Sequence, residues 1–304
     1  MEDEAGASAS CRSRARGFTP NAAARSLLAG RSGTVGLITS DMEGRFSIPV
    51  MMGAEDAFGA GEMSVFLCDA RGDSIREQHH IDALLSRRVE GIIVVGSTTD
   101  PRPPLSRRPP VPVVYAYAPS EDPDDLSIVG DNVQAGSLAV RHLLDVGRRR
   151  IAHIGGDREF SASTDRAAGV LSELAAHDLA LRGAEPLYGA WNEGWGRRAV
   201  RVLLDRDPDV DGIVCGSDQI ARGVIEGLVE LGKRVPSDIS VIGFDNWRVI
   251  AENTRPPLTS IDFRVEDLGR LAAEKLFAAI GGETDHGTIR VPSRLVVRGS
   301  SIPE

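Results

Sequence analysis

Residues that can bind phosphate gather near the start of this sequence. No acidic residue lies between Ala5 and Ser40, and the same segment holds five arginines: Arg12, Arg14, Arg16, Arg25 and Arg31. The whole chain, in contrast, has a formal net charge of −9. A basic segment on an acidic body suggests a local anionic partner such as the phosphate backbone of DNA. An ordinary solvated N-terminal helix is the alternative, and composition alone favours it.

Motifs of catalysis and of metal binding are lacking elsewhere. The run Gly59–Ser64 lacks the last glycine of a dinucleotide-binding loop and follows a helical pattern where that loop follows a strand. His79 and His80 are adjacent, so on a helix they point apart and cannot both ligate one metal. The three aspartates within residues 122–125 lack the glycine and the terminal glutamate of a calcium loop. We therefore expect no enzyme, no catalytic residue, no metal site and no cofactor.

The segment from Thr19 to Gly30 has the composition of a short helix. Thr19 can cap it through its hydroxyl, and Pro20 falls at the first helical position, where its missing N–H has little effect. Three alanines favour the helix, and Gly30 ends it. A helix of about ten residues is marginal alone in water, so we expect it to form only when a partner holds it.

The rest of the composition indicates a soluble protein. The 304 residues suffice for two lobes, each with a core, and 41% hydrophobic with 26% charged residues is ordinary for globular proteins. No apolar run is long enough to span a membrane, and the first four residues are acidic, unlike a secretory signal. Three distant cysteines suit reduced thiols. These features predict a cytoplasmic location.

Strand-like and helical patterns alternate along the chain after residue 33. In the first half, apolar runs at 35–38, 65–68, 91–95 and 113–117 alternate with helical patterns at 48–58 and 74–88. In the second half, helical patterns at 134–146, 164–177, 193–204, 219–231 and 265–280 alternate with strand-like runs at 151–155, 185–188, 212–215, 240–244, 258–261 and 294–298. This alternation is typical of doubly wound α/β layers with parallel strands.

One sequence pattern occurs twice. Val-Glu-Gly-Ile-Ile-Val at 89–94 matches Val-Asp-Gly-Ile-Val-Cys at 210–215, and a Gly-Ser pair follows each run. Such internal similarity implies two similar α/β lobes. Because ligands bind beyond the carboxyl ends of the strands in open parallel sheets, two facing lobes predict a small-molecule cleft between them.

A series of short motifs follows a fixed order along the chain. They are Gly-Phe-Thr-Pro-Asn-Ala-Ala-Ala-Arg-Ser-Leu at 17–27, Arg-Arg-Val-Glu-Gly-Ile-Ile at 87–93, Val-Gly-Asp-Asn at 129–132, Arg-Ile-Ala-His-Ile-Gly-Gly at 150–156, Arg-Ala-Ala-Gly at 166–169 and Pro-Ser-Asp-Ile-Ser-Val-Ile-Gly-Phe-Asp-Asn at 236–246. Each is weak alone, but in this order and spacing the chain resembles the lactose-repressor (LacI/GalR) family of bacterial transcription regulators. The effector-binding body of that family is similar to periplasmic sugar-binding proteins.

The resemblance implies an α/β fold of two doubly wound parallel-sheet lobes, periplasmic-binding-protein-like, with a short N-terminal hinge helix. We expect residues 1–32 to form the basic arm and the hinge helix. Residues 33–149 with 262–286 are expected to form the N-terminal lobe, and residues 150–261 with 287–304 the C-terminal lobe.

The resemblance also implies an effector site between the lobes. Arg166 matches the family's arginine that clamps ligand hydroxyls or carboxylates, a role that suits its rigid set of donors. Asp245 matches an acid that accepts hydrogen bonds from the ligand, and a turn or capping residue is its alternative role. Trp191 matches an aromatic residue that packs on the flat face of a sugar or base, and a core tryptophan is its alternative role.

Three further residues are expected at this site. Phe46 is placed to wall it from the first lobe, and Gln134 and Ser217 stand where family members carry other polar residues. The family's usual Asn-Pro-Phe-Phe is replaced here by Glu-Gly-Arg-Phe at 43–46. Arg45 therefore adds a positive charge that can face an anionic ligand.

In the family, the segment that matches 17–30 is a hinge helix that enters the minor groove of an operator. The DNA-binding residues implied are Asn21, Ala24, Arg25 and Leu27. Leu27 matches a leucine wedged between base pairs, and a core contact with the body is its alternative role. We expect the family's helix-turn-helix to be missing or truncated here, because residues 1–16 show neither its apolar periodicity nor its recognition helix. We therefore expect weak DNA binding with little base discrimination.

These observations predict a homodimeric, ligand-responsive transcription regulator, acting as a repressor, with no membrane partner. It binds a small sugar-like or nucleoside-like effector between its lobes and operator DNA through its N-terminal region. One alternative is a small-molecule (sugar) binding module without DNA-binding activity, which predicts an export signal that the sequence does not show. The other is an enzyme on the same scaffold, which needs a catalytic constellation that we do not find.

Overall fold

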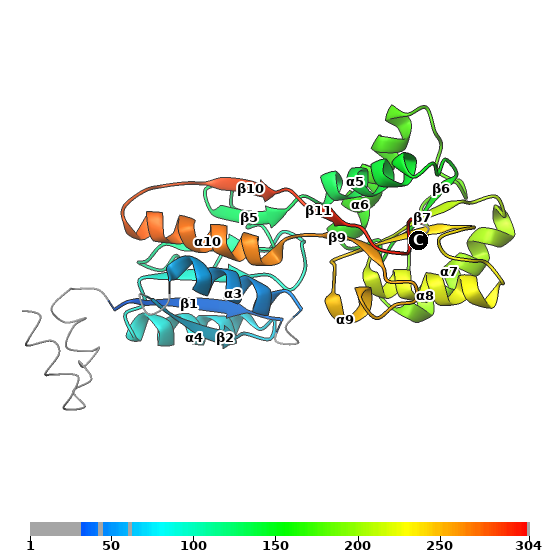
Figure 1. Cartoon of the computed structure of the whole chain (residues 1–304). Helices are drawn as coiled ribbons and strands as arrows, with labels where there is room; N and C mark the ends of the chain where they lie inside the picture. The colour runs from blue at the N-terminus through cyan, green and yellow to red at the C-terminus, as the bar shows by residue number, and fades with distance from the viewer. Residues whose placement is uncertain (1–31, 42–44, 60–62, 303–304) are drawn as a thin grey trace, which may run out of the picture.

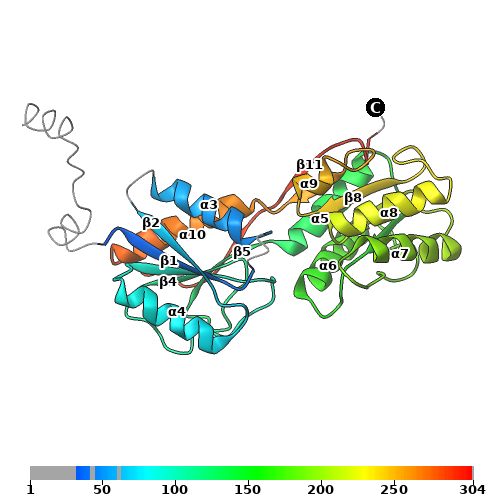
Figure 2. The same cartoon turned by 90° about the horizontal axis from the view of Figure 1, so that it is seen from below.

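The computed structural model describes residues 32–41, 45–59 and 63–302. These residues form two α/β lobes that lie side by side, with chain segments running between them (Figure 1, Figure 2). The predicted fold of two lobes with parallel sheets is confirmed, whereas the predicted hinge helix lies outside the described residues. Among the helices described, none is both long and apolar enough to cross a membrane.

The first lobe is a six-stranded sheet in the order β10-β5-β4-β3-β1-β2, and every neighbouring pair is parallel. Its strands are β1 (Thr34–Thr39), β2 (Ser64–Asp69), β3 (Gly91–Val95), β4 (Val113–Ala116), β5 (Leu126–Gly130) and β10 (Gly287–Val291). Its helices are α3 (Ser47–Phe58), α4 (Ser74–Ser86) and α10 (Val265–Ile280). Helices α3 and α10 cover one face of the sheet, and α4 covers the other (Figure 2).

The second lobe is a five-stranded sheet in the order β11-β9-β8-β7-β6, in which only the β11 pairing is antiparallel. Its strands are β6 (Ile151–Ile154), β7 (Gly212–Cys215), β8 (Ser240–Phe244), β9 (Thr259–Asp262) and β11 (Arg294–Val296). Its helices are α5 (Asn132–Asp145), α6 (Ser161–Ala176), α7 (Glu193–Arg206), α8 (Asp218–Glu230) and the short α9 (Arg248–Ala251).

The cores explain why the strands read as continuous apolar runs. In β3, Ile93 and Val95 pack toward α3 and α10, while Ile92 and Val94 pack toward α4. All five residues of β3 are buried. A strand in the middle of a parallel sheet with helices on both faces has no solvent-facing side, so its sequence lacks the polar alternation of a half-exposed strand.

Paired glycines hold the main helix pairs together. In each of the pairs α3 with α10, α5 with α6, and α7 with α8, a glycine on each helix faces the backbone of the other: Gly53 and Gly269, Gly136 and Gly169, Gly196 and Gly223. A Cβ atom on any of the six would lie 1.8–2.2 Å from a backbone oxygen of the partner helix. The helices therefore approach more closely than a helix with a side chain at that position allows.

The lobe boundaries differ from the predicted ones. The chain leaves the first sheet after β5, so residues 132–149 lie in the second lobe, because the apolar face of α5 packs on α6 and under the second sheet. Residues 287–291 lie in the first lobe, because β10 pairs with β5 as an edge strand. An amphipathic pattern shows that a helix has a buried face but not which sheet covers that face.

The strands also differ from the predicted ones at three places. Residues 126–130 and 287–291 form strands that the sequence pattern did not indicate. The predicted strand at 185–188 is reduced to one isolated bridge between Ile154 and Leu187. The repeated runs at 89–94 and 210–215 do form equivalent strands, since β3 lies beside β1 and β7 lies beside β6.

Candidate functional site

A cavity of about 220 Å³ lies between the two lobes. The first lobe contributes Phe46, Tyr117 and residues 97–99, and the second contributes residues of α6 and of the loops after β6 and β8. Residues 97–99 follow β3, Tyr117 follows β4 and Asp245 follows β8. The cavity thus opens at the carboxyl ends of the strands of both sheets, where parallel α/β sheets bind ligands.

Arg166 on α6 lies at the base of this cavity and is only 3% exposed. Its Nε donates to Oδ1 of Asn132 at 2.9 Å, one terminal nitrogen donates to the carbonyl of Gly216 at 2.5 Å, and the other donates to Oδ1 of Asp245 at 3.5 Å. Its guanidinium carbon lies 4.6 Å from the ring centre of Phe263. These contacts hold the guanidinium in one orientation, so its remaining donors are available to a ligand in a fixed direction.

Asp245 occupies a backbone conformation that side-chain-bearing residues rarely adopt. Its φ is 95°, and that of Asn246 is 48°. Such conformations persist only where surrounding contacts hold them. Here the carboxylate of Asp218 accepts from the Trp247 amide and from the Ser260 hydroxyl, both at 2.6 Å, and that hydroxyl accepts from the Asn246 amide at 3.0 Å. Asp218 is therefore the anchor that presents Asp245 to the cavity.

Asp218 should make the stability of the protein depend on pH. Burial, and secondarily the nearby Asp245 carboxylate, raise the pKa of Asp218 to about 8 from an ordinary value of 3.8. Between these two values the unfolded chain releases this proton and the folded chain keeps it, so the free energy of unfolding falls as pH rises and levels off above pH 8. We expect Asp218→Asn to remove this fall. The free energy of unfolding of the variant, relative to that of the wild type, should rise by up to about 1.4 kcal/mol per pH unit between about pH 5 and about pH 8, as measured by urea unfolding.

Asp238→Asn is the matched control for this prediction. Side-chain and backbone hydrogen bonds from Arg234 lower the pKa of Asp238 to about 2, so its carboxylate stays ionised throughout the same range. The stability difference between this variant and the wild type should not change with pH. If the stability difference between Asp218→Asn and the wild type also did not change with pH, Asp218 would not be protonated in the folded protein.

Aromatic rings form two walls of the cavity. Phe46 and Tyr117 stack with their ring centres 4.4 Å apart and an angle of 21° between the planes. Phe160 meets Trp191 edge to face at 6.2 Å and 82°. Trp191 lies flat on the backbone at Gly156, where a Cβ atom would be 2.3 Å from the indole ring. Flat apolar faces of this kind suit the C–H faces of a sugar ring or the face of a base.

Polar contacts between the lobes close the cavity on two sides. Arg45, which precedes α3, forms an ion pair with Oδ2 of Asp245 and donates to Oε1 of Gln219 at 3.2 Å. On the other side, the amide of Ser161 donates to Oδ1 of Asp100 at 2.7 Å. The described conformation is therefore a closed one, in which side chains of the protein bridge the two lobes.

Four of the six predicted effector residues line this cavity: Phe46, Arg166, Trp191 and Asp245. Gln134 does not, because its side-chain amide exchanges hydrogen bonds with the backbone of Ser293, where the chain crosses between β10 and β11. Ser217 does not either, since it is buried and caps the N-terminus of α8 by accepting from the Ile220 amide. Both side chains are engaged in the scaffold, and the site proposed below omits them.

The sequence reasoning missed Tyr117, Phe160 and residues 97–99 as cavity residues. The signal for 97–99 and for Tyr117 was available, because 97–99 come just after the predicted strand at 91–95 and Tyr117 ends the predicted strand at 113–117, on the edge of the sheet where ligands bind. Phe160 follows no strand directly, and no pattern indicated it. The predicted DNA-binding residues Asn21, Ala24, Arg25 and Leu27 lie outside the described residues.

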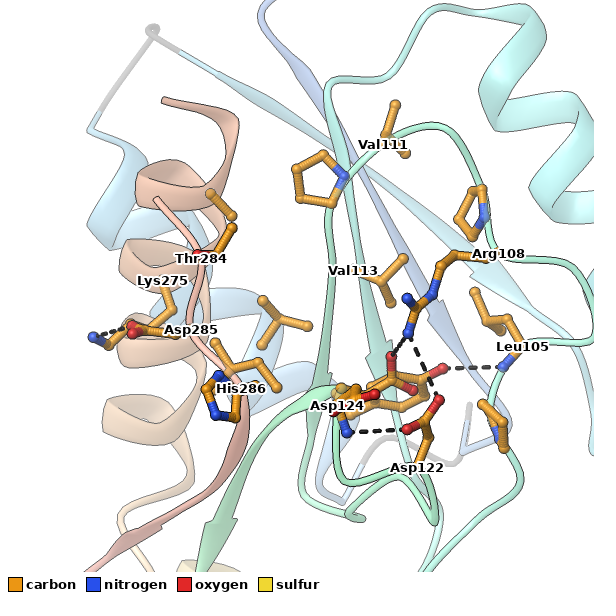
Figure 3. A pocket seen from close by; sticks show the side chains of 18 of the residues that line it. Leu105, Arg108, Val111, Val113, Asp122, Asp124, Lys275, Thr284, Asp285 and His286 are labelled. Atoms are coloured by element: carbon orange, nitrogen blue, oxygen red, sulfur yellow. Dashed lines mark hydrogen bonds and ion pairs between the residues drawn. The ribbon is translucent and has the colours of Figure 1, made fainter. Parts of the chain in front are cut away.

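A larger cavity, of about 700 Å³, lies in the first lobe at the opposite ends of the strands (Figure 3). Its two basic side chains are already paired, since Arg108 lies 3.3 Å from Asp125 and Lys275 lies 2.7 Å from Asp285, and its other charged side chains are acidic. Within the described part of the chain, no group of three or more His, Cys, Asp or Glu residues is arranged to hold a metal ion. The cavity between the lobes is therefore the stronger candidate for ligand binding.

The family model and the most similar relatives that were found agree on one protein family. A family model described as a periplasmic binding protein-like domain matches residues 140–301. Catabolite control protein A of Priestia megaterium is 31% identical over 288 residues, which is 94% of this chain and 86% of that protein. The transcriptional regulator CelR of Thermobifida fusca is 33% identical over 288 residues, which is 92% of this chain and 83% of that protein.

Solved structures agree with these relatives. A LacI-family regulator from Rhizobium etli matches with a TM-score of 0.81 and 26% identity, covering 89% of this chain and 99% of that chain. The complex of the regulator CelR with cellobiose matches with a TM-score of 0.70 and 27% identity, covering 95% of this chain and 88% of that chain. CelR and the two proteins of known structure are named as transcription regulators.

Proposed function

The chain belongs to the LacI/GalR family of bacterial transcription regulators, and from this membership we propose that it is a ligand-responsive repressor. The proposed effector is a small sugar-like or nucleoside-like molecule that binds between the lobes. The proposed DNA contact is through the N-terminal region, and the proposed active form is a homodimer. The observation that carries the effector site is the convergence of Arg166, Asp245 and two aromatic walls on one cavity between two lobes.

The chemistry of the cavity suits a polar ring. Arg166 supplies donors in a fixed direction, Asp245 supplies acceptors, and the aromatic faces contact the apolar surfaces of the ring. The cavity volume of about 220 Å³ is below the range of about 300–1,000 Å³ typical for drug-sized ligands. The proposed effector is therefore about as large as a single sugar ring or nucleobase.

Effector binding is proposed to act through the relative position of the lobes. A ligand that contacts both lobes stabilises the closed arrangement over an open one by the difference in its affinity for the two. Strand β1 begins at Thr34, so the predicted hinge segment at 17–30 leads directly into the first lobe. A change in lobe orientation is thus transmitted to the segment proposed to contact DNA.

A ligand screen followed by a single substitution tests the effector site. Thermal-shift measurements against pentoses, hexoses, purines, nucleosides and sugar phosphates should find a stabilising compound, whose affinity is then measured by calorimetry. Asp245→Asn should weaken that affinity roughly tenfold or more, because a hydrogen bond to a charged group contributes about 1.5–3 kcal/mol. Asp267→Asn, which removes a carboxylate from a neighbouring groove of about 520 Å³ but not from the cavity, should leave it unchanged. Equal affinities of wild type and Asp245→Asn for a neutral compound would reject this site.

DNA binding is tested on the same protein. Fluorescence anisotropy with a labelled duplex should show binding that weakens as salt rises, and the effector should change that affinity. The proposed contact residues Asn21, Ala24, Arg25 and Leu27 stay predictions until such data exist. A protein that binds its effector but no DNA at any salt concentration would instead be a small-molecule binding module.

A further inference from the structure

The formal charges of the residues that line the cavity do not sum to zero. Of its lining residues, only Arg45, Arg166 and Asp245 carry a formal charge, so two guanidinium groups share one carboxylate. Arg45 pairs with one oxygen of Asp245, and Arg166 donates to the other. Both pairs are largely shielded from water, since the Asp245 side chain is only 7% exposed. The lining carries one net positive charge.

The hydrogen-bond donors are also in excess. Each guanidinium has five N–H donors and no acceptor. Arg166 uses three donors on described residues, and Arg45 uses two. The Nε of Arg45 is buried without a hydrogen-bond partner among those residues. A buried unsatisfied donor is unfavourable, so the site favours a ligand that brings acceptors.

Among the described residues, no acidic group other than Asp245 lines the cavity. Asp218 lies behind the turn that carries Asp245, and burial raises the pKa of Asp218 to about 8, so it is mostly protonated at neutral pH. Asp41 and Asp100 are at the edge of the cavity, and each accepts from a backbone amide, of Phe46 and Ser161 respectively. Neither lines the cavity.

Arg45 also separates two compartments. It lines both the 220 Å³ cavity and a groove of about 520 Å³ on the outer side of the lobe junction. Its guanidinium carbon lies 4.8 Å from the ring centre of Trp247, which belongs to that groove. A ligand that enters from the groove therefore meets Arg45 before it reaches Arg166.

We propose that the effector is a small anion, a carboxylate- or phosphate-bearing sugar, and that its anionic group binds Arg45 in place of Asp245. This rests on the proposed effector site between the lobes. In the described structure, Asp245 occupies the place of the anion and holds Arg45 across the cleft. In the complex, the anion bridges Arg45 and Arg166, so the bridge between the lobes passes through the ligand. Asp245 is then free to accept from the hydroxyls of the sugar.

The test compares anions with neutral sugars of matching shape. Calorimetry at neutral pH measures wild-type affinity for D-glucuronate, D-galacturonate, D-gluconate and D-glucose 6-phosphate, and for D-glucose, D-galactose and methyl D-glucuronate. At least one anion should bind ten times more tightly than its neutral counterpart, and raised salt should reduce that preference. Whether the carboxylate-bearing or the phosphate-bearing compounds bind more tightly identifies the anionic group.

Variants assign the preference to Arg45. Arg45→Gln should remove the preference for the anion, while Arg45→Lys should retain part of it, since a lysine keeps the charge. Arg248→Gln removes an exposed charge from the outer groove only and should change nothing. Circular dichroism checks that each variant is folded.

Three results would overturn the proposal. They are equal binding of anions and neutral sugars by the wild type, an unchanged preference in Arg45→Gln, and binding of neutral sugars alone. If neutral sugars bind and Asp245→Asn weakens their binding, the effector site is supported but the anionic effector is rejected. Failure of all seven compounds to bind would reject the anion as stated, and the wider ligand screen would then decide on the effector site itself.

Discussion

Arg166→Met is expected to abolish effector binding and to lower the free energy of unfolding by about 3–5 kcal/mol, the usual loss when one partner of a buried ion pair is removed. The arginine is buried, and it is the shared hydrogen-bond partner of Asn132, the Gly216 carbonyl and Asp245. Methionine fills part of the space but donates no hydrogen bond, so three largely buried acceptors lose a partner. The loss therefore affects the scaffold and the ligand together.

Tryptophan fluorescence during urea unfolding measures this effect well. The three tryptophans of the chain are Trp191, Trp195 and Trp247, and all lie in the second lobe, as Arg166 does. The signal therefore reports the lobe in which the change is made. Arg201→Met is the control, because Arg201 pairs with Glu230 on the surface of the same lobe, where such pairs contribute about 0–1 kcal/mol. If both variants unfolded at the same urea concentration, Arg166 would not have the structural role assigned to it.

Gly169→Ala should destabilise the second lobe by about 3 kcal/mol, although alanine favours a helix over glycine by about 1 kcal/mol. The added Cβ atom would lie 2.0 Å from the carbonyl oxygen of Val133 on α5. Backbone cannot move aside as a flexible side chain can, so α5 and α6 must separate. Their separation also breaks the hydrogen bond from the Ser137 hydroxyl to the Gly169 carbonyl.

The same substitution should weaken effector binding. Asn132 is the first residue of α5 and holds the Nε of Arg166 on α6, so a wider spacing of the two helices pulls this contact apart. Gly194→Ala is the matched control. In the first turn of α7, its Cβ atom would meet only side-chain atoms at 3.3 and 3.5 Å. It should be neutral or slightly stabilising, and equal effects of the two alanines would contradict the close packing of α5 on α6.

Patterns that are local in sequence allowed much of the fold to be predicted. Strand β3 and helix α4 follow from apolar periodicity within single segments, and the two lobes follow from the repeated run at 89–94 and 210–215. Arg166 and Asp245 were indicated by their place in a series of family motifs and Trp191 by the same family resemblance, and all three do line one cavity. These inferences depend on neighbours a few residues apart, which a sequence displays directly.

Contacts between distant residues decided what the sequence left open. Arg45 and Asp245 are 200 positions apart and meet only because the lobes face each other. Gln134 is held by Ser293, 159 positions away, and so is turned to the crossing segment and not to the cavity. The assignment of α5 and β10 to lobes likewise depended on which sheet offered a matching surface or edge. The sequence by itself determined most of the elements and the polar groups available to a ligand. The tertiary structure decided which of them converge, because the pattern within a segment does not specify the partner it packs against.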